Sequence, residues 1–350
     1  MNIRRLRIAS LGLIGAAIVP TNCAAASWPA TARPAGGPIL VGTGVAWVTP
    51  RADHGGDLFE AVRGRSARLV QSFPAPPSDG VGERHLEFGI AGSRSDLILS
   101  AHMYCTELPR GIACDETTDV YAGAVGHALT RIRHCEGAFA PPSVSIDRHL
   151  AAFPDCGGRL VVHDLTGTAP DESYGSNVAA GQIGGRFVAW FEGTPLPGAE
   201  PSDPYITVYD RKNQRVSYTI SRRRIGSQIT SFTLQRDGTI AFASDPHPND
   251  SRVQDAVAWA SPRHPIPHRV RLSVRAHYAI ELARGRLAFA RATARGAPGR
   301  RPEIGIANLR ARTHLISRHA AGYGIGFDGR RVSFAHRVGK RVRISVVRAR

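Results

Sequence analysis

A short hydrophobic–small–aromatic motif recurs along this chain, and the repeat limits the possible folds more than any other feature. Five copies are clear, and two degenerate copies fit between the first and the second. The seven copies are Val45-Ala46-Trp47, Leu97-Ile98-Leu99, Leu150-Ala151-Ala152, Val188-Ala189-Trp190, Ile240-Ala241-Phe242, Leu287-Ala288-Phe289 and Val332-Ser333-Phe334. Their third residues are 38 to 53 positions apart. Blades of a β-propeller repeat every ~40 to 50 residues, so the spacing favours that architecture.

Glycine, often after aspartate, precedes the motif in most copies. The stretches "RDGTIAFASD" (236–245) and "FDGRRVSFAHR" (327–337) show the same form. Glycine reaches positive φ without steric cost and closes tight hairpins. We therefore interpret the Asp-Gly pairs as turns between strands rather than as a chemical motif. The preceding residues are Gly44, Gly185, Asp237-Gly238, Gly285 and Asp328-Gly329.

A second strand pattern follows every copy. Most of these segments alternate apolar with small or polar residues, which is typical of a half-buried strand. They span residues 57–62, 119–125, 159–165, 205–210, 255–260, 303–309 and 343–347. A weaker further strand often comes next, as in "ARLVQSF", "RVSYTIS", "HRVRLS" and "RTHLIS". No convincing amphipathic helix is visible after the N-terminal region.

These patterns predict an all-β fold, a seven-bladed β-propeller of four-stranded antiparallel blades. Six or eight blades are alternatives, and a pair of two-sheet sandwiches is the main structural rival. The last repeat stops after its third strand. We expect the segment from Ser27 to Arg33 to supply the fourth strand, which would close the ring and protect its edge.

The strand–turn–strand unit resembles the repeats of TolB-like propellers, a subset of WD-repeat-like propellers. The resemblance covers almost the whole chain after residue 26. Members of that group commonly act in protein–protein contacts at the bacterial cell envelope, so the resemblance implies a binding function.

The N-terminus has the features of a secretory signal. Arg4, Arg5 and Arg7 precede an apolar stretch, Ile8 to Val19, and Ala24-Ala25-Ala26 offers a small-residue cleavage site. The apolar stretch is shorter than the roughly 20 residues that span a bilayer. We therefore expect a signal peptide over 1–26, a single propeller domain over 27–350, and a secreted or cell-envelope location in a bacterium.

Four cysteines remain after the expected signal: Cys105, Cys114, Cys135 and Cys156. In an exported chain they indicate two disulfides, for which three pairings are possible. We favour Cys105–Cys114 and Cys135–Cys156, because neighbours in sequence would close local loops. A four-cysteine zinc site is less favoured, since the close pairs that such sites use are missing.

Known catalytic and phosphate-binding motifs are not found in the sequence. His247, His264 and His268 lie in a proline-rich stretch, where we interpret them as exposed loop histidines rather than metal ligands. We accordingly predict no catalytic residue, no metal and no cofactor.

The net charge of +17 is distributed unevenly along the chain. Residues 251–350 contain 22 Lys and Arg against four acidic residues, whereas residues 1–250 contain 23 against 24. In a propeller, the loops between strands two and three share one face with the loops between blades. On that face we expect a basic ligand-binding surface made of Arg222, Arg223, Arg224, Arg275, Arg295, Arg300, Arg301, Arg337, Lys340 and Arg341.

Arginine's planar fork suits carboxylate, phosphate and sulfate, and clustered charge speeds the encounter with an anionic partner. The favoured hypothesis is a secreted, non-enzymatic, monomeric scaffold that contacts an anionic macromolecule, an envelope polymer or a protein. The alternative is a hydrolase or lyase with its site at the mouth of the central channel. Dedicated nucleic-acid binding is not expected, because no recognition module is visible.

Overall fold

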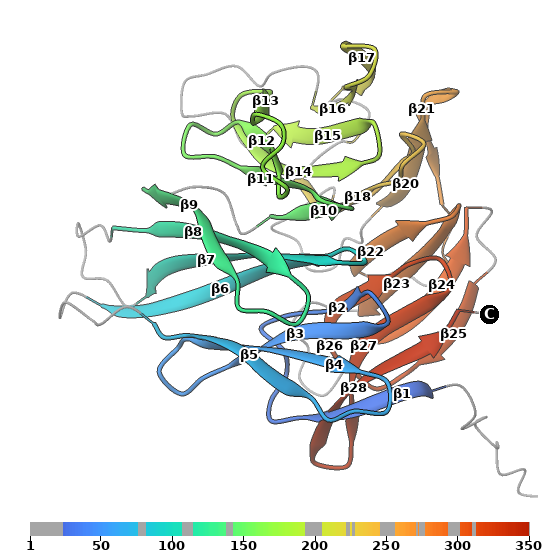
Figure 1. The fold of residues 1–350 in the computed structure, drawn as a ribbon. Coiled ribbons are helices and arrows are strands. Elements are labelled where there is room, and N and C mark those ends of the chain that lie inside the picture. Colours follow the sequence, from blue (N-terminus) through green and yellow to red (C-terminus); the bar gives the residue numbers. More distant parts are fainter. Residues whose placement is uncertain are drawn as a thin grey trace, which may run out of the picture.

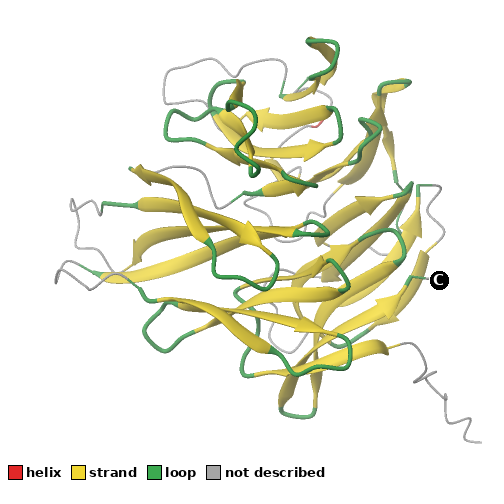
Figure 2. Ribbon diagram, viewed as in Figure 1, coloured by secondary structure: helices red, strands yellow, loops and turns green. Residues whose placement is uncertain are grey.

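The computed structural model describes residues 24–75, 82–106, 115–137, 143–192, 205–221, 225, 228–245, 256–270, 272, 277–292, 302–309 and 313–349. Its described elements are 28 β-strands in seven four-stranded antiparallel sheets. Figure 2 shows the strands in yellow and the connecting loops in green. Among the residues described, none forms a helix of the length and apolarity needed to cross a membrane.

Each sheet is one blade of four strands, and blades 1 to 6 take their strands in chain order. Blade 1 comprises β2 (Gly36–Val41), β3 (Gly44–Pro50), β4 (Gly56–Val62) and β5 (Arg68–Phe73). Blade 2 comprises β6 (Glu83–Gly92), β7 (Asp96–Thr106), β8 (Thr117–Ala124) and β9 (Thr130–Glu136). Blade 3 comprises β10 (Ser145–Asp147), β11 (Leu150–Pro154), β12 (Leu160–Asp164) and β13 (Glu172–Tyr174).

The second half of the ring follows the same order. Blade 4 comprises β14 (Val178–Gly184), β15 (Phe187–Glu192), β16 (Ile206–Asp210) and β17 (Arg215–Ile220). Blade 5 comprises β18 (Gln228–Leu234), β19 (Ile240–Asp245), β20 (Ala256–Ser261) and β21 (His264–Arg269). Blade 6 comprises β22 (His277–Ala283), β23 (Arg286–Ala292), β24 (Glu303–Asn308) and β25 (Thr313–Ser317). Blade 7 comprises β26 (Ala320–Phe327), β27 (Arg331–Val338), β28 (Arg341–Arg348) and β1 (Ala24–Ala30).

The seven sheets follow one another around a ring (Figure 1). The first strand of each blade contacts the first strand of the next, and β26 of blade 7 returns to β2 of blade 1. The prediction of a seven-bladed propeller is thus confirmed. Rings of six or eight blades and the pair of sandwiches are excluded.

The repeated sequence motif forms the second strand of every blade and supplies the core. The side chains of Trp47, Leu99 and Phe289 are almost completely buried, at 1%, 0% and 0% exposure. The apolar clusters lie between blades: one joins Val257 of blade 5 to Ile280 of blade 6. Burying one such side chain contributes about 1.5–3 kcal/mol. Each blade is therefore stabilised chiefly by its neighbours.

The Asp-Gly pairs are turns, as predicted. The Asp237 carboxylate accepts the backbone N–H of Thr239 at 2.9 Å, and Gly238 has a φ of 82°. Asp328 likewise accepts the N–H of Arg330 at 2.8 Å. This local pairing turns the chain from the first strand of a blade into the second.

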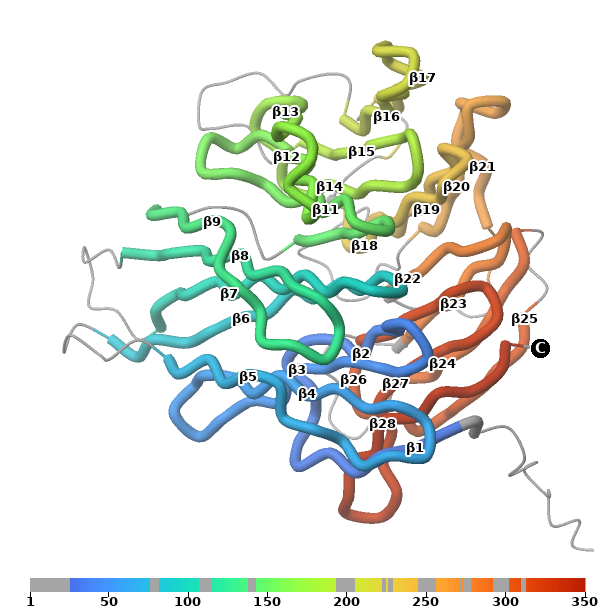
Figure 3. Tube along the Cα trace, viewed as in Figure 1, coloured from blue at the N-terminus to red at the C-terminus, as the bar shows by residue number. Residues whose placement is uncertain are grey.

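The N-terminal strand β1 closes the ring. It pairs antiparallel with β28, so that Ser27 lies opposite Ser345 and Trp28 opposite Ile344. Figure 3 shows the blue N-terminal strand beside the red C-terminal one. The Trp28 ring is 5% exposed, and its Nε1 donates to the Arg65 carbonyl at 2.8 Å. The predicted closure is confirmed, although the strand begins and ends three residues earlier than expected.

Hydroxyl side chains also connect the first strands of neighbouring blades. Ser231 Oγ accepts the N–H of Ile280 at 3.0 Å, and Thr233 Oγ1 accepts that of Leu282 at 3.3 Å. Ser145 Oγ accepts the N–H of Ile183 at 3.1 Å in the same way. These bonds satisfy backbone donors beside the channel that no strand of their own blade can pair.

A disulfide joins blades 2 and 3. Cys135 of β9 bonds to Cys156, which lies in the turn between β11 and β12. This confirms one of the two favoured pairings and removes two cysteines from any four-thiolate zinc site. Cys105 is also disulfide-bonded, and Cys114, the partner expected for it, lies outside the described residues.

The interpretation of the proline-rich stretch was partly wrong. His264 and His268 do not lie in a loop but belong to β21, the outer strand of blade 5. The His268 ring stacks on Trp259 with centroids 4.8 Å apart. Proline is tolerated there because an edge strand leaves every second N–H without a partner in the sheet. His247 lies outside the described residues.

Candidate functional site

The propeller presents two faces, and each carries a different set of connections. We call the face with the turns between first and second strands the turn face. These turns lie at 41–44, 92–96, 147–150, 184–187, 234–240, 283–286 and 327–331. We call the face with the connections between second and third strands the hairpin face.

Three of the ten predicted basic residues are described, and all three lie on the hairpin face. Arg337, Lys340 and Arg341 are exposed around the tight turn in which Val338 pairs with Arg341. The structure therefore brings these three together. The other seven lie outside the described residues: Arg222, Arg223, Arg224, Arg275, Arg295, Arg300 and Arg301.

A cavity of about 880 Å³ opens at the channel mouth on the turn face, and every blade contributes to its lining. Two of its carboxylates are held by arginines. Arg236 Nε donates to Asp147 Oδ1 at 2.8 Å, and Asp147 also accepts the N–H of Gly185. The third acid, Glu60, has its pKa raised by burial. With four arginines against three acids in the lining, the mouth is close to electrically balanced.

Arginines flank the turns of six blades on this face. They are Arg94 in blade 2, Arg148 in blade 3, Arg186 in blade 4, Arg236 in blade 5, Arg284 and Arg286 in blade 6, and Arg330 and Arg331 in blade 7. Arg186, Arg236 and Arg331 have acidic partners. Within the part of the chain that the structure describes, Arg94, Arg148, Arg284 and Arg330 form no ion pair. The turn face is thus ringed by arginines, several of them with an uncompensated charge.

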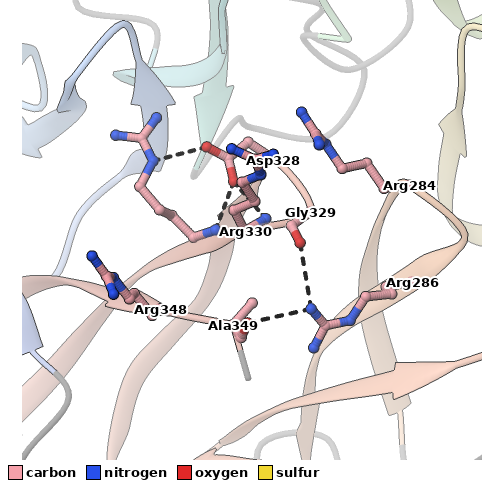
Figure 4. A pocket seen from close by; sticks show the side chains of 8 residues that line it. Arg284, Arg286, Asp328, Gly329, Arg330, Arg348 and Ala349 are labelled. Atoms are coloured by element: carbon pink, nitrogen blue, oxygen red, sulfur yellow. Dashed lines mark hydrogen bonds and ion pairs between the residues drawn. The ribbon is translucent and has the colours of Figure 1, made fainter.

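The densest group lines a second cavity, of about 810 Å³, between blades 6 and 7 (Figure 4). We call this cavity the arginine pocket. It adjoins the channel mouth, because Arg284, Asp328 and Arg331 line both cavities. Its lining consists of Arg284, Arg286, Asp328, Gly329, Arg330, Arg331, Arg348 and Ala349. Five arginines against one aspartate give the lining a formal charge of +4, in contrast to the balanced mouth.

Backbone carbonyls position one arginine of the pocket. Arg286 Nη1 lies 3.4 Å from the Gly329 carbonyl and 3.3 Å from that of Ala349, so its guanidinium bridges two segments of blade 7. Figure 4 places Arg284 and Arg286 on one side of the Asp328–Gly329 turn and Arg348 on the other.

The single aspartate of the pocket is already neutralised. Arg331 Nε donates to Asp328 Oδ2 at 2.8 Å, and the N–H groups of Arg330 and Arg331 donate to Oδ1. Burial raises the pKa of Asp328, but these hydrogen bonds outweigh it and hold the pKa below its usual value. Asp328 therefore stays ionised and pairs with Arg331, while Arg284, Arg330 and Arg348 form no ion pair within the described part of the chain.

This arrangement can bind oxyanions. Guanidinium groups donate two parallel hydrogen bonds to carboxylate or phosphate, and an electrostatic site on a concave surface concentrates anions. Elsewhere in the described ranges, no group of three or more His, Cys, Asp or Glu side chains is arranged to hold a metal ion.

The pocket was not predicted, because the excess charge was expected on the hairpin face. A signal was nevertheless present. Arginines stand directly beside the turn glycines in "RGR" (284–286) and "DGRR" (328–331). Since these turns all lie on one face of a propeller, the pattern itself indicates an arginine-rich turn face.

No family model and no curated protein matches the sequence. Solved structures resemble the fold at low sequence identity. A chain of the "Crystal Structure of Mitotic Checkpoint Complex" aligns over 100% of this chain and 99% of its own, with a TM-score of 0.54 and 12% identity. The Pan2 WD40 domain of Neurospora crassa aligns over 91% of this chain and 89% of its own, with a TM-score of 0.51 and 10% identity. These likenesses concern the fold alone and are consistent with a seven-bladed propeller.

Proposed function

We propose that this protein is a secreted, non-enzymatic binding scaffold that contacts an anionic macromolecule through the arginine-rich surface of blades 6 and 7. The partner is an acidic protein or an anionic polymer of the cell envelope. The observation that carries the proposal is the concentration of arginines, five against one aspartate, at the turns of these two blades, beside a channel mouth that is itself nearly balanced.

Both ends of the two blades contribute basic groups. The arginine pocket lies on the turn face, and Arg337, Lys340 and Arg341 lie on the hairpin face. Exposed ion pairs contribute only about 0–1 kcal/mol each, so a single arginine would not define a binding surface. Basic groups clustered at the same two blades reinforce one another, and such clustered charge raises the rate of encounter with an anion by about 10- to 1,000-fold at low salt.

Secretion is compatible with the closed ring. Cleavage before Ser27 would remove Ala24 to Ala26 but would leave the pairing of residues 27–30 with β28. Trp28, which anchors the strand, would also remain. N-terminal sequencing of the exported protein tests this part: a first residue of Ser27 supports it, and an uncleaved N-terminus contradicts it.

Salt-dependent retention on a polyglutamate resin tests the binding surface. The triple variant Arg337→Ser, Lys340→Ser, Arg341→Ser removes the described basic group of the hairpin face. Its matched control, Arg63→Ser, Lys212→Ser, Arg215→Ser, removes the same residue types from exposed positions of blades 1 and 4. We expect the hairpin variant to elute at clearly lower salt than the control. At ~0.1 M salt the Debye length is about 10 Å, so only charges close to the bound polymer contribute to retention.

Equal elution of the two triple variants would show that only the net charge matters and would refute a specific surface. A variant with Arg222, Arg223, Arg224, Arg300 and Arg301 changed to Ser extends the same test to predicted residues outside the described ranges. Retention equal to wild type in that variant would remove those five from the surface.

A further inference from the structure

We propose that the channel mouth on the turn face binds an apolar side chain of the partner, while acidic residues beside that side chain pair with Arg284 and Arg330. This inference rests on the proposed function and specifies the partner as a peptide segment in which an apolar residue is flanked by glutamate or aspartate. The cavity at the mouth has a volume of about 880 Å³, which falls within the ~300–1,000 Å³ that is usual for ligand pockets.

The blade 1 side of the mouth offers an apolar surface. Blades 7, 1 and 2 follow one another around the ring, and each lines the cavity with apolar side chains that are partly exposed. These side chains are Leu40 and Val62 of blade 1, Val125 of blade 2 and Phe327 of blade 7. Val62, the last residue of β4, is 41% exposed. An apolar side chain of a partner would remove this surface from water, which favours binding.

Two buried polar atoms of the cavity lining have no hydrogen-bond partner among the described residues. They are Glu60 Oε1 and Gln235 Nε2. Glu60 is 6% exposed, and Gln235 already uses its Oε1 to accept the N–H of Gly285 at 3.3 Å. An unpaired acceptor and an unpaired donor match the N–H and the C=O of a peptide backbone. An ionised fatty acid has no donor for Glu60, so these two atoms favour a peptide over a lipid chain.

Two arginines without an acidic partner border the mouth at blades 6 and 7. Arg284 lines the cavity, and Arg330 follows the Asp328–Gly329 turn of the next blade. Both are exposed, and neither forms an ion pair within the described ranges. The stem of Arg284 lies against this turn because Gly329 has no side chain: a Cβ there would be 2.6 Å from Arg284 Cδ. Figure 4 shows Arg284 beside the turn, where its charge adds to that of Arg330.

The backbone of Arg284 supports a role for its side chain. Its φ of 53° lies in the left-handed region, and Gly285 after it has a φ of 68°. Such a turn favours glycine, asparagine or aspartate at both positions, because a longer side chain there crowds the backbone. The turn itself therefore does not require an arginine. A residue held in an unfavourable backbone conformation points to a function of its side chain.

The apolar surface and the arginines together have the layout of a binding hot spot. In such interfaces an apolar anchor fills a pocket, and polar or charged groups surround it. The nearly balanced charge of the mouth suits an uncharged anchor, and the arginines of blades 6 and 7 suit acidic neighbours. A purely acidic peptide would leave the mouth empty, and a purely apolar one would leave the arginines unpaired.

Fluorescence polarisation with the full chain tests the proposal. The probe is a labelled peptide with two leucines between two pairs of glutamates, and the comparison peptide has serines in place of the leucines and the same charge. We expect the wild type to bind the leucine peptide about tenfold more tightly than the serine peptide. Decanoate, an apolar chain with one carboxylate, is the competitor that represents a lipid.

The variant Val62→Ser tests the apolar anchor. Its matched control is Val216→Ser, which changes a valine of β17 that is 52% exposed and does not line the mouth. We expect Val62→Ser to weaken binding of the leucine peptide about threefold and to leave binding of the serine peptide unchanged. The control should change neither affinity.

The double variant Arg284→Ser, Arg330→Ser tests the charged rim. Its matched control is Arg215→Ser, Arg263→Ser, which removes two exposed arginines from blades 4 and 5 that line neither cavity. We expect the rim variant to bind both peptides about tenfold more weakly than wild type, and the control to differ from wild type by less than about twofold. Circular dichroism confirms that each variant is folded.

Equal affinity of the wild type for the two peptides overturns the apolar anchor, and so does an equal effect of Val62→Ser and its control. Equal affinity of the rim variant and its control overturns the pairing with Arg284 and Arg330. Displacement of the probe by decanoate at a lower concentration than by unlabelled leucine peptide overturns the peptide in favour of a lipid chain. In each case, salt-dependent retention of the wild type on polyglutamate leaves the proposed function standing. Loss of that retention instead refutes the proposed function itself.

Discussion

Glu281 carries a carboxyl group in an environment that disfavours its ionised form. It lies in β22, the first strand of blade 6, and accepts a hydrogen bond from Thr233 Oγ1 of blade 5 at 3.4 Å. Burial raises the pKa of Glu281 from 4.5 to about 7, and the bond from Thr233 offsets only part of this. The folded protein therefore keeps a proton here at pH values where the unfolded chain has released it.

The sign and size of the effect follow from that difference. A raised pKa in the folded state gives stability that is fully present below pH 4.5 and is lost as the pH rises to about 7. The difference between a pKa of 4.5 and one of about 7 corresponds to about 3 kcal/mol, since a tenfold change in proton affinity is worth about 1.4 kcal/mol. The variant Glu281→Gln has no proton to lose, and its amide oxygen can still accept the Thr233 hydroxyl. Its free energy of unfolding should equal that of wild type near pH 4 and exceed it by about 3 kcal/mol at pH 8.

Urea unfolding of both proteins between pH 4 and 8 measures this difference. Burial also raises the pKa of Glu60 and lowers that of His336, but both groups are common to the two proteins and cancel in the difference. Glu87→Gln is the control, since it removes an exposed carboxylate from the first strand of blade 2 and should change stability by no more than about 0.5 kcal/mol. A difference between wild type and Glu281→Gln that does not vary with pH would refute the reasoning.

Two further predictions concern the joints of the ring. Trp28→Ala removes a buried ring and its hydrogen bond to the Arg65 carbonyl at the closing strand. It should lower the free energy of unfolding, measured by urea titration, by about 3–5 kcal/mol. A loss as small as that of the exposed-site control Ile266→Ala would contradict the role of β1 in closure. The double variant Cys135→Ser, Cys156→Ser removes the disulfide between residues 21 positions apart and should lower the free energy of unfolding, measured by thermal unfolding, by about 3 kcal/mol. Unchanged stability would show that blades 2 and 3 are held together without the disulfide.

The fold could be predicted because its determinants are local and periodic. The second strand of each blade is an apolar run of fixed pattern, and the turn before it carries glycine. Even the two degenerate copies, which lack a terminal aromatic residue, proved to be buried second strands: Leu97, Ile98 and Leu99 are all fully buried. The regular spacing of the repeats along the chain identified these two strands, although their sequences lack the aromatic residue of the other copies.

The outer strand β21 was predicted at residues 268–273, four residues later than its observed position at 264–269, for a physical reason. Its sequence "HPIPHR" has little alternation, and Ile266 at its centre is 59% exposed. An edge strand packs on one neighbour only, so its sequence is weakly constrained. The prolines that suggested a loop instead leave an edge that other strands cannot extend.

The arginine pocket depends on contacts that no local pattern encodes. Arg286 and Ala349 are 63 positions apart, and only the packing of blade 7 against blade 6 brings them together. The sequence placed the excess charge correctly in the last blades. The face on which this positive charge lies depends on the short turns between strands. Single arginines beside the glycines of these turns were interpreted as part of the turn and not as part of a basic surface.

Photo-crosslinking with a hexaglutamate peptide that carries a benzophenone tests the central claim most directly. After irradiation of the full chain, mass spectrometry locates the crosslinked residues. The account predicts crosslinks within 284–286, 328–331 and 348–349, and their loss when unlabelled acidic peptide is added in excess. Crosslinks concentrated in blades 1 to 5 would contradict it.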